Sequence, residues 1–222
     1  EAHLGATYNT PDFPVIDHYT YALCGDGDLM EGVAYEACSL AGKLQLGKLV
    51  VLYDSNDISL DGDLSQAFVE NVKDRFEAQG WHYLRVEDGN DLNAISAAIE
   101  AAKAHTSQPT IIEIKTVIGF GSKNEGTAKV HGAPLGSEDW IATKAKYGWN
   151  YPAFTVPEEA AQLFAEKVQA RGAKANEAWN QLFEAYKVAH PEKAAALVAA
   201  FQGKLPEGYD AGLKLVGPET AA

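Results

Sequence analysis

The sequence predicts an α/β protein in which a doubly wound parallel sheet is followed by a helical C-terminal appendix. Short apolar runs alternate with helical patterns as far as Val117. Beyond that point the chain shows helical patterns only. The chain has 222 residues, 46% of them hydrophobic, which is enough to bury a full core. These three observations set the fold class.

Four short apolar runs are the candidate strands, at residues 19–24, 48–53, 81–86 and 110–117. Stretches with helical spacing of apolar residues separate them, at residues 29–46, at residues 68–79, and in an alanine-rich segment for which Asp91 is the expected N-cap. Strands alternating with helices at these spacings indicate βαβ units and therefore a parallel sheet.

The second half of the chain has a different pattern. Residues 119–136 are rich in glycine and predict a loop, and helices are expected at residues 138–147, 157–171, 175–190 and 191–202. The tail is weakly patterned. We therefore divide the chain into an α/β part (1–136), a helical part of the same domain (137–203) and a strap or linker (204–222).

Composition excludes several classes of partner. The formal net charge of −13 predicts a surface that repels nucleic acid and anionic membranes. No apolar run approaches the roughly 20 residues of a membrane span, and the first residues do not resemble a signal peptide. The two cysteines fit a reduced compartment. These features predict a cytoplasmic protein.

Oxygen-bearing side chains follow the first two candidate strands. The first strand leads into Gly25-Asp26-Gly27 and the second into Asp54-Ser55-Asn56. Ligands of open parallel sheets bind outside the carboxyl ends of the strands, so Asp26 and Asn56 are expected at one rim. Their oxygens suit Mg²⁺ or Ca²⁺. A helix expected just after Gly27 would offer free N–H groups to a phosphate.

Other interpretations of these motifs fit less well. Gly-Asp-Gly after a strand is often only a turn. The segment "DSNDISLDGD" lacks the glycine of an EF-hand loop, and Ile58 stands where an oxygen ligand is needed. There is no Gly-Lys-Ser/Thr phosphate loop, and the third glycine of "GDGDLMEG" is misplaced for a dinucleotide fingerprint. The pairing of Asp26 with Asn56 across one crossover favours a metal-bound diphosphate.

Longer blocks of sequence carry a family resemblance. The segments "GDGDLMEGVAYEACSLAGKLQLGKLVVLYDSNDISLDG", "GWHYLRVEDGND", "IGFGS" and "VHGAPLG" occur in that order. Together they resemble the transketolase family of thiamine-diphosphate enzymes over essentially the whole chain. Pyruvate-decarboxylating relatives share the metal motif but are not expected to share the later blocks. Dihydroxyacetone synthase, a related ketol transferase, is harder to exclude on these blocks of sequence.

The resemblance implies a set of site residues. Asp26 and Asn56 would bind Mg²⁺ or Ca²⁺ through their side chains, and Ile58 through its carbonyl. Gly25 and Gly27 would lie against the diphosphate of thiamine diphosphate. Leu60 and Ile118 would line an apolar slot for the cofactor, which lowers the local dielectric.

Two further residues are implied as catalytic. His131, in "VHGAPLG", would contact the diphosphate and assist proton transfer, for which the pKa class of histidine is suited. A structural role is the alternative for this loop histidine. Glu31 would belong to a proton relay between two active sites of a homodimer; the alternative is a solvated acid in the first turn of a helix.

The resemblance also implies a reaction and a missing part. The parent enzyme would transfer a two-carbon ketol unit from a ketose phosphate to an aldose phosphate, in the pentose phosphate pathway. The chain would cover the later part of the diphosphate-binding domain, truncated at its N-terminus, and would be inactive alone. A non-catalytic half-subunit of a split transketolase is the alternative from a different functional class.

Overall fold

The structure, a computed structural model, describes residues 1–213. Contacts divide the chain into two compact units, each described here by itself. The first unit contains Glu1 and residues 18–155, and the second contains residues 2–17 and the described residues from Val156 onward. The domain bounds inferred from the sequence refer to a longer protein and remain a prediction. Part of the predicted linker, residues 214–222, lies outside the described residues.

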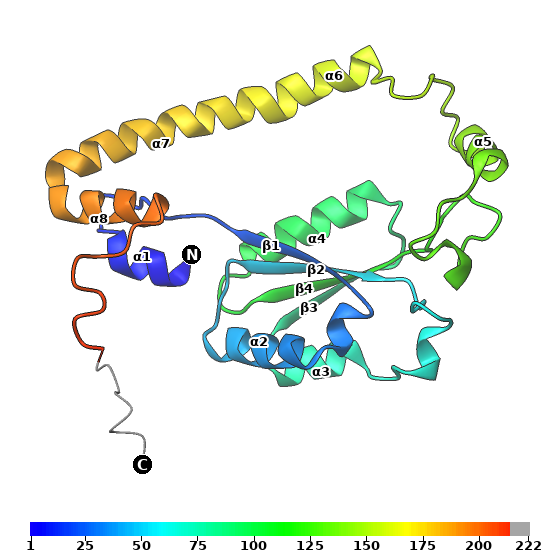
Figure 1. The fold of residues 1–222 in the computed structure, drawn as a ribbon, viewed down its shortest axis with the longest axis horizontal. Helices are drawn as coiled ribbons and strands as arrows, with labels where there is room; N and C mark the ends of the chain where they lie inside the picture. Colours follow the sequence, from blue (N-terminus) through cyan, green and yellow to red (C-terminus); the bar gives the residue numbers. More distant parts are fainter. Residues whose placement is uncertain (214–222) are drawn as a thin grey trace, which may run out of the picture. The chain divides into compact units, whose positions relative to one another are not determined.

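The first unit is built on a four-stranded parallel sheet with the strand order β1-β2-β4-β3. Helices α2 and α3 cover one face of the sheet and α4 covers the other (Figure 1). This confirms the predicted doubly wound α/β fold. The elements are β1 (Thr20–Gly25), α2 (Gly32–Lys43), β2 (Leu49–Ser55), α3 (Val72–Ala78), β3 (His82–Val86), α4 (Leu92–Ala104) and β4 (Thr110–Lys115).

Side chains of the strands alternate between two hydrophobic clusters, one on each face of the sheet. Tyr53 and Ile111 belong to the cluster beneath α2 and α3, whereas Val50 and Ile112 belong to the cluster beneath α4. Because helices cover both faces, β4 is buried along most of its length. A strand that is buried on both faces has a nearly continuous run of apolar residues, and this run allowed β4 to be predicted from the sequence.

Side-chain caps set the starts of α3 and α4. The Asp91 carboxylate accepts the N–H groups of Asn93 and Ala94, both at 3.0 Å, which confirms the predicted N-cap of α4. Asn71 caps α3 in the same way by accepting the N–H of Asp74 at 3.2 Å. Helix α3 is shorter than the predicted residues 68–79, because a 3₁₀ turn at Leu64–Gln66 and an extended stretch precede it.

The helix predicted at residues 29–46 does not begin where expected. A 3₁₀ turn occupies Asp28–Met30, and Glu31 then adopts an extended conformation with φ −71° and ψ 135°. The α-helix therefore starts at Gly32. A helix does begin directly after Gly27, as expected, but it is a single 3₁₀ turn and is separate from the α-helix that follows.

The first unit continues beyond β4 through a long loop into α5 (Ser137–Lys146). The loop contains a 3₁₀ turn at Ala128–Val130 and is otherwise irregular, as predicted. Gly121 has φ 89°, and a Cβ atom there would lie 2.7 Å from the Tyr147 ring. A left-handed backbone and a close approach to an aromatic ring both require glycine at this position.

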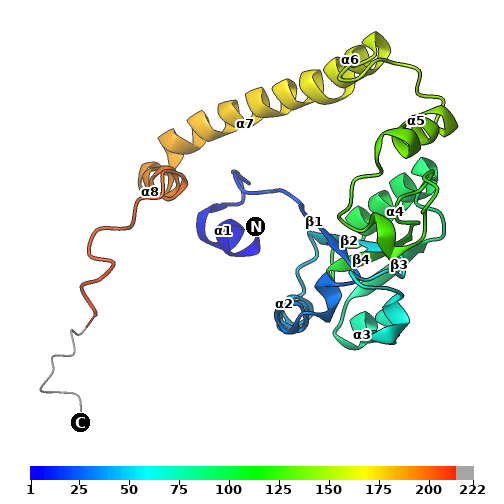
Figure 2. The same ribbon diagram turned by 45° about the vertical axis from the view of Figure 1, so that its right-hand side comes forward.

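The second unit is helical and contains α1 (Ala2–Tyr8), α6 (Glu158–Phe164), α7 (Ala170–Ala189) and α8 (Pro191–Phe201). A π-helical segment at Ala165–Gln169 joins α6 to α7, so the two helices predicted at residues 157–171 and 175–190 form one continuous run (Figure 2). Its core includes Phe183, Tyr186 and Leu197. The Tyr186 hydroxyl donates to the Tyr8 carbonyl at 2.6 Å, which anchors α1.

Candidate functional site

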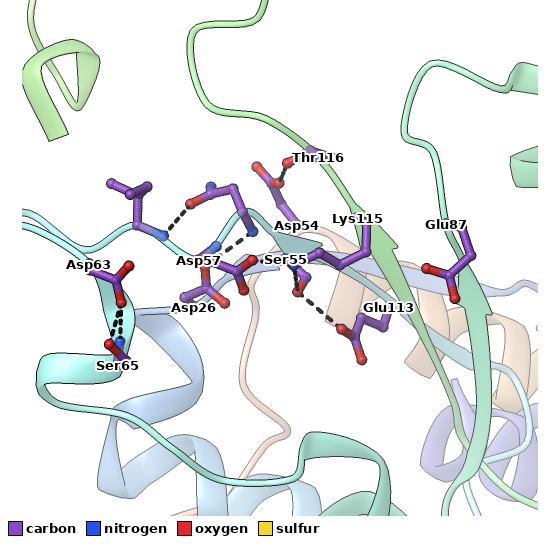
Figure 3. A network of polar contacts seen from close by, with 12 residues as sticks. Asp26, Asp54, Ser55, Asp57, Asp63, Ser65, Glu87, Glu113, Lys115 and Thr116 are labelled. Atoms are coloured by element: carbon purple, nitrogen blue, oxygen red, sulfur yellow. Dashed lines mark hydrogen bonds and ion pairs between the residues drawn. The ribbon is translucent and has the colours of Figure 1, made fainter. Parts of the chain in front are cut away.

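The two oxygen-bearing motifs meet at the carboxyl ends of β1 and β2. These strands are neighbours, and Gly25 is the register partner of Asp54. Asp26 is the first residue after β1, and Asn56 is the first residue after β2. The Asn56 N–H donates to Asp26 Oδ2 at 3.2 Å. The structure therefore brings Asp26 and Asn56 together, as the sequence predicted. Figure 3 shows Asp26 close to Asp57, the residue that follows Asn56.

Asp26 is a buried carboxylate held by neutral donors. It is 3% exposed. The Tyr53 hydroxyl donates to Oδ1, and the N–H groups of Asn56 and Asp57 donate to Oδ2 at 3.2 and 3.0 Å. Burial raises the pKa of Asp26, although these three hydrogen bonds act in the opposite direction. An anion that is desolvated but has no cation among these donors is suited to accept a bound cation.

The loop after β2 adds two oxygens of the kind that hard cations prefer. Asn56 Oδ1 accepts the N–H of Ile58 at 3.0 Å, which fixes the orientation of the amide. Ile58 pairs with Asp63 in an isolated antiparallel bridge, so its backbone is also constrained. Within residues 1–213 no group of three or more His, Cys, Asp and Glu side chains could hold a metal ion. The candidate set of Asp26, Asn56 and the Ile58 carbonyl instead combines one carboxylate with neutral oxygens, a donor set that Mg²⁺ and Ca²⁺ accept.

Gly27 is not explained by the fold. Its φ of −63° and ψ of −37° are accessible to any residue. A Cβ atom built there would meet no atom within 4 Å. The open space beside the Gly27 backbone fits an approaching ligand such as a diphosphate. Gly25, by contrast, is the last residue of β1, and its N–H is bonded to Asp28 Oδ2 at 2.8 Å.

The two residues expected to line an apolar slot lie in loops that leave adjacent strands. Leu60 follows β2 and is 69% exposed. Ile118 follows β4 and is half-buried, and its carbonyl accepts the N–H of Gly126 at 2.8 Å. Strands β2 and β4 are paired, so both loops start at the same edge of the sheet. Their side chains are available to a ligand, but the slot itself remains a prediction.

The two expected catalytic residues lie on the surface. His131 is exposed and ends the 3₁₀ turn of the loop after β4, where its N–H donates to the Ala128 carbonyl at 3.0 Å. Glu31 is exposed and precedes α2 without capping it through its side chain. Within the described residues, neither side chain makes a hydrogen bond or ion pair with Asp26 or Asn56. Their catalytic roles remain predictions.

Sequence reasoning missed the supporting contacts. Tyr53 was recognised only as the end of a strand, yet its hydroxyl holds Asp26. Lys115, from β4, contacts Asp57 and Ser55. Asp54 accepts the Thr116 hydroxyl and points away from this network, since it alternates with Tyr53 and Ser55 along β2. The alternation could have shown that Tyr53 and Ser55 share a face, but only the sheet order shows what they meet.

Known proteins resemble this chain closely. Residues 1–206 match the family described as transketolase, thiamine diphosphate binding domain. The chain is 61% identical over 201 residues to the transketolase of Streptococcus pyogenes serotype M6, covering 90% of this chain and 28% of that protein. It is 58% identical over 215 residues to the transketolase of Geobacillus stearothermophilus, covering 96% of this chain and 32% of that protein.

Solved structures show the same fold. A transketolase from Leishmania mexicana matches with a TM-score of 0.90 and 44% sequence identity, over 97% of this chain and 32% of that one. A transketolase from Pichia stipitis, solved with sedoheptulose 7-phosphate, matches with a TM-score of 0.89 at 48% identity, over 98% of this chain and 32% of that one. The chain thus spans less than a third of the length of the relatives it matches.

Proposed function

Because the chain belongs to the transketolase family and contains its thiamine-diphosphate-binding domain, we propose that it forms the diphosphate-binding part of an enzyme that transfers a two-carbon ketol unit from a ketose phosphate to an aldose phosphate. The observation that carries this proposal is the junction of Asp26 and Asn56 at the ends of β1 and β2, beside the open backbone of Gly27. Among the described residues, no helix is long and apolar enough to cross a membrane.

In this proposal Asp26 and Asn56 hold Mg²⁺ or Ca²⁺ through their side chains, and Ile58 contributes its carbonyl oxygen. Gly27 offers its N–H to the diphosphate. Thiamine diphosphate, when bound, supplies the carbon nucleophile and the electron sink that C–C bond cleavage needs. Leu60 and Ile118 exclude water from the cofactor and so lower the local dielectric.

His131 moves a proton at the reacting carbon, or at the oxygen attached to it. His131 is exposed and lies in the loop that leaves the carboxyl end of β4, and the same edge of the parallel sheet carries Asp26 after β1, which supports this role. A histidine is suited to such a transfer near neutral pH.

The net charge of −13 repels phosphorylated sugars, so their binding requires locally positive groups or the metal ion at the site. No nucleic acid or membrane partner is proposed, and the setting is cytoplasmic.

The homodimer is proposed on an apolar stripe that runs along α2 to its C-cap, Leu44. Val33, Leu40 and Leu44 are 71%, 57% and 57% exposed, although their spacing is that of a helix face made to be buried. Exposed apolar stripes of this kind mark protein interfaces. Glu31 lies immediately before this helix, which supports its assignment to a relay that joins two sites across the interface.

The test replaces the proposed metal ligands. In the full polypeptide encoded by the gene that carries this segment, Asp26→Ala and Asn56→Ala should abolish Mg²⁺-dependent binding of thiamine diphosphate, measured by calorimetry, because the diphosphate is held through the ion. Asn180→Ala is the matched control, since Asn180 is exposed on α7 and its amide donates to Asn176 Oδ1 at 3.0 Å. Unchanged cofactor affinity in either ligand variant would overturn the assignment. An unaltered protein without ketol transfer from xylulose 5-phosphate to ribose 5-phosphate would overturn the proposed reaction.

A further inference from the structure

The loop that carries Asn56 contains a residue in a left-handed conformation. Asp57 has φ 62°, a region that residues with side chains rarely enter, although Asp and Asn tolerate it better than others. Asp57 lies between Asn56 and Ile58, two of the three proposed metal ligands. The conformation at Asp57 therefore decides how those two oxygens are presented, and it persists only if its surroundings impose it.

Three contacts hold Asp57 in place. Its N–H donates to Asp26 Oδ2 at 3.0 Å, and its carbonyl accepts the N–H of Leu64 at 2.8 Å. Its carboxylate pairs with Lys115 Nζ at 2.7 Å. The first contact is with Asp26, and the second is with Leu64 in the same loop. The third comes from the end of β4, which is part of the central sheet.

Lys115 contacts both neighbours of Asn56 in the chain. It is the register partner of Ser55, and its Nζ donates to Ser55 Oγ at 3.2 Å as well as to Asp57 (Figure 3). The Lys115 side chain is 23% exposed, whereas the Asp57 side chain is 69% exposed. The lysine is the more shielded partner and belongs to a paired strand, so the strand constrains the exposed aspartate of the loop.

The other end of this contact is fixed as well. Ser55 Oγ donates to Glu113 Oε1 at 3.0 Å. Glu113 is 8% exposed and also accepts from Tyr83 at 2.6 Å and from Arg85 at 2.8 Å. Ser55 is therefore tied to a buried carboxylate and Lys115 to the paired backbone of β4. A loop held at both flanks by a rigid sheet loses little freedom when an ion binds.

We propose that Lys115 is a positioning residue for the metal site, which holds Ser55 and Asp57 so that Asn56 and the Ile58 carbonyl are in place before the ion arrives. This inference rests on the proposed function for the identity of the ion. Lys115 itself contacts neither the ion nor the substrate. Its cationic charge alone would weaken cation binding, and the Asp57 carboxylate offsets it.

The test must distinguish the ordering of the loop by the ion pair from the electrostatic effect of an unpaired charge on cation binding. Lys115→Met leaves an unpaired anion that attracts a cation, and Asp57→Asn leaves an unpaired cation that repels one. The double variant Lys115→Met/Asp57→Asn has the same net charge as the unaltered protein but no ion pair. Asparagine still tolerates the left-handed backbone at position 57. A matched neutral control is Lys103→Met/Glu100→Gln, which removes an exposed ion pair of 2.8 Å on α4.

The measurement is the Mg²⁺ concentration that half-saturates thiamine diphosphate binding, together with kcat at saturating Mg²⁺, in the full polypeptide. Loss of one partly exposed pair that orders the loop predicts an increase of about three- to tenfold in the half-saturating Mg²⁺ of the double variant. We expect kcat of the double variant to be unchanged. The α4 control should have the same half-saturating Mg²⁺ concentration as the unaltered protein, and Lys115→Arg should have a similar one. A residue with only a structural role would lower the unfolding temperature and leave the Mg²⁺ dependence unchanged.

Unchanged half-saturation in the double variant, with normal binding by the unaltered protein, would overturn the role of Lys115 alone. Absence of Mg²⁺-dependent binding in the unaltered protein would overturn the proposed function instead. If the double variant does not fold, Ser55→Ala removes the other Lys115 contact and should raise half-saturating Mg²⁺ in the same direction. An unchanged value in a folded Ser55→Ala would contradict the inference.

Discussion

Tyr53→Phe is the most discriminating single change at the site. The Tyr53 ring is 2% exposed and packs in the core beneath α2 and α3, while its hydroxyl donates to Asp26 Oδ1. The substitution removes one oxygen and leaves the ring in place. Among the described residues, the donors that remain to Asp26 are the N–H groups of Asn56 and Asp57, both on Oδ2. The free Oδ1 loses the contact that fixes its direction.

The size of the effect follows from the contact. Partners that orient a metal ligand typically contribute about 10- to 100-fold to metal affinity, so Tyr53→Phe should weaken Mg²⁺-dependent cofactor binding by that factor. A hydrogen bond to a charged group contributes about 1.5–3 kcal/mol, which sets the expected loss in the free energy of unfolding of the metal-free protein. Calorimetry and chemical denaturation measure the two quantities separately.

Tyr186→Phe is the control for this experiment. Tyr186 is also fully buried, and its hydroxyl donates at 2.6 Å to a neutral carbonyl, that of Tyr8, in the second unit. Its removal should cost about 0.5–1.5 kcal/mol of stability and leave metal affinity unchanged. The reasoning would be refuted if Tyr53→Phe bound metal and cofactor as tightly as the unaltered protein, or if both variants weakened binding equally.

Three further predictions concern turnover, association and pH. His131→Ala in the full polypeptide should lower kcat by about 10²–10⁴-fold and weaken cofactor binding less; near-normal kcat would return His131 to a structural role. The 222-residue chain alone, verified by mass, should show no ketol transfer and should self-associate in analytical ultracentrifugation, because edge strand β1 exposes Leu23 at 83%. A monomeric, active chain would contradict both. Burial and the stacked His105 ring lower the pKa of His82, so the unfolded state binds its proton more readily, and stability should fall as pH decreases through 6.5. The free energy of unfolding, measured by chemical denaturation between pH 5 and 8, should depend less steeply on pH in His82→Gln than in the unaltered protein. An equal pH dependence in the two proteins would exclude His82 as its cause.

The strands were predictable because each is an apolar run, and β4 is apolar where helices cover both of its faces. The cap at Asp91 was predictable for a similar reason, since a single side chain supplies it. Helix α1, of seven residues, was not predicted, because it is short and depends on contacts with α8 and Tyr186 from the far end of the chain. The break expected between two C-terminal helices is absent, since a π-helical segment continues the run.

The site was predictable where residues lie at strand ends and unpredictable where support comes from across the sheet. Asp26 and Asn56 follow adjacent strands in the chain, so topology alone brings them together. Lys115 and Asp57 are 58 positions apart, and their ion pair exists because β4 is inserted between β2 and β3. Nothing in the local sequence shows that order. Gly27 was expected to let the backbone approach a diphosphate; its ordinary dihedral angles show that the turn itself does not need glycine, and the ligand role stays a prediction.

The continuous helix from Glu158 to Ala189 has two halves with very different environments. Its C-terminal half buries Phe183 and Tyr186, whereas Leu163, Phe164 and Val168 in its first half are 57%, 54% and 43% exposed. A helical segment without tertiary packing is marginally stable in water. Amide hydrogens in residues 158–172 should therefore exchange with deuterium much faster than those around Tyr186. Slow exchange there in the full polypeptide, with fast exchange in the 222-residue chain, would show that another part of the protein covers these three side chains.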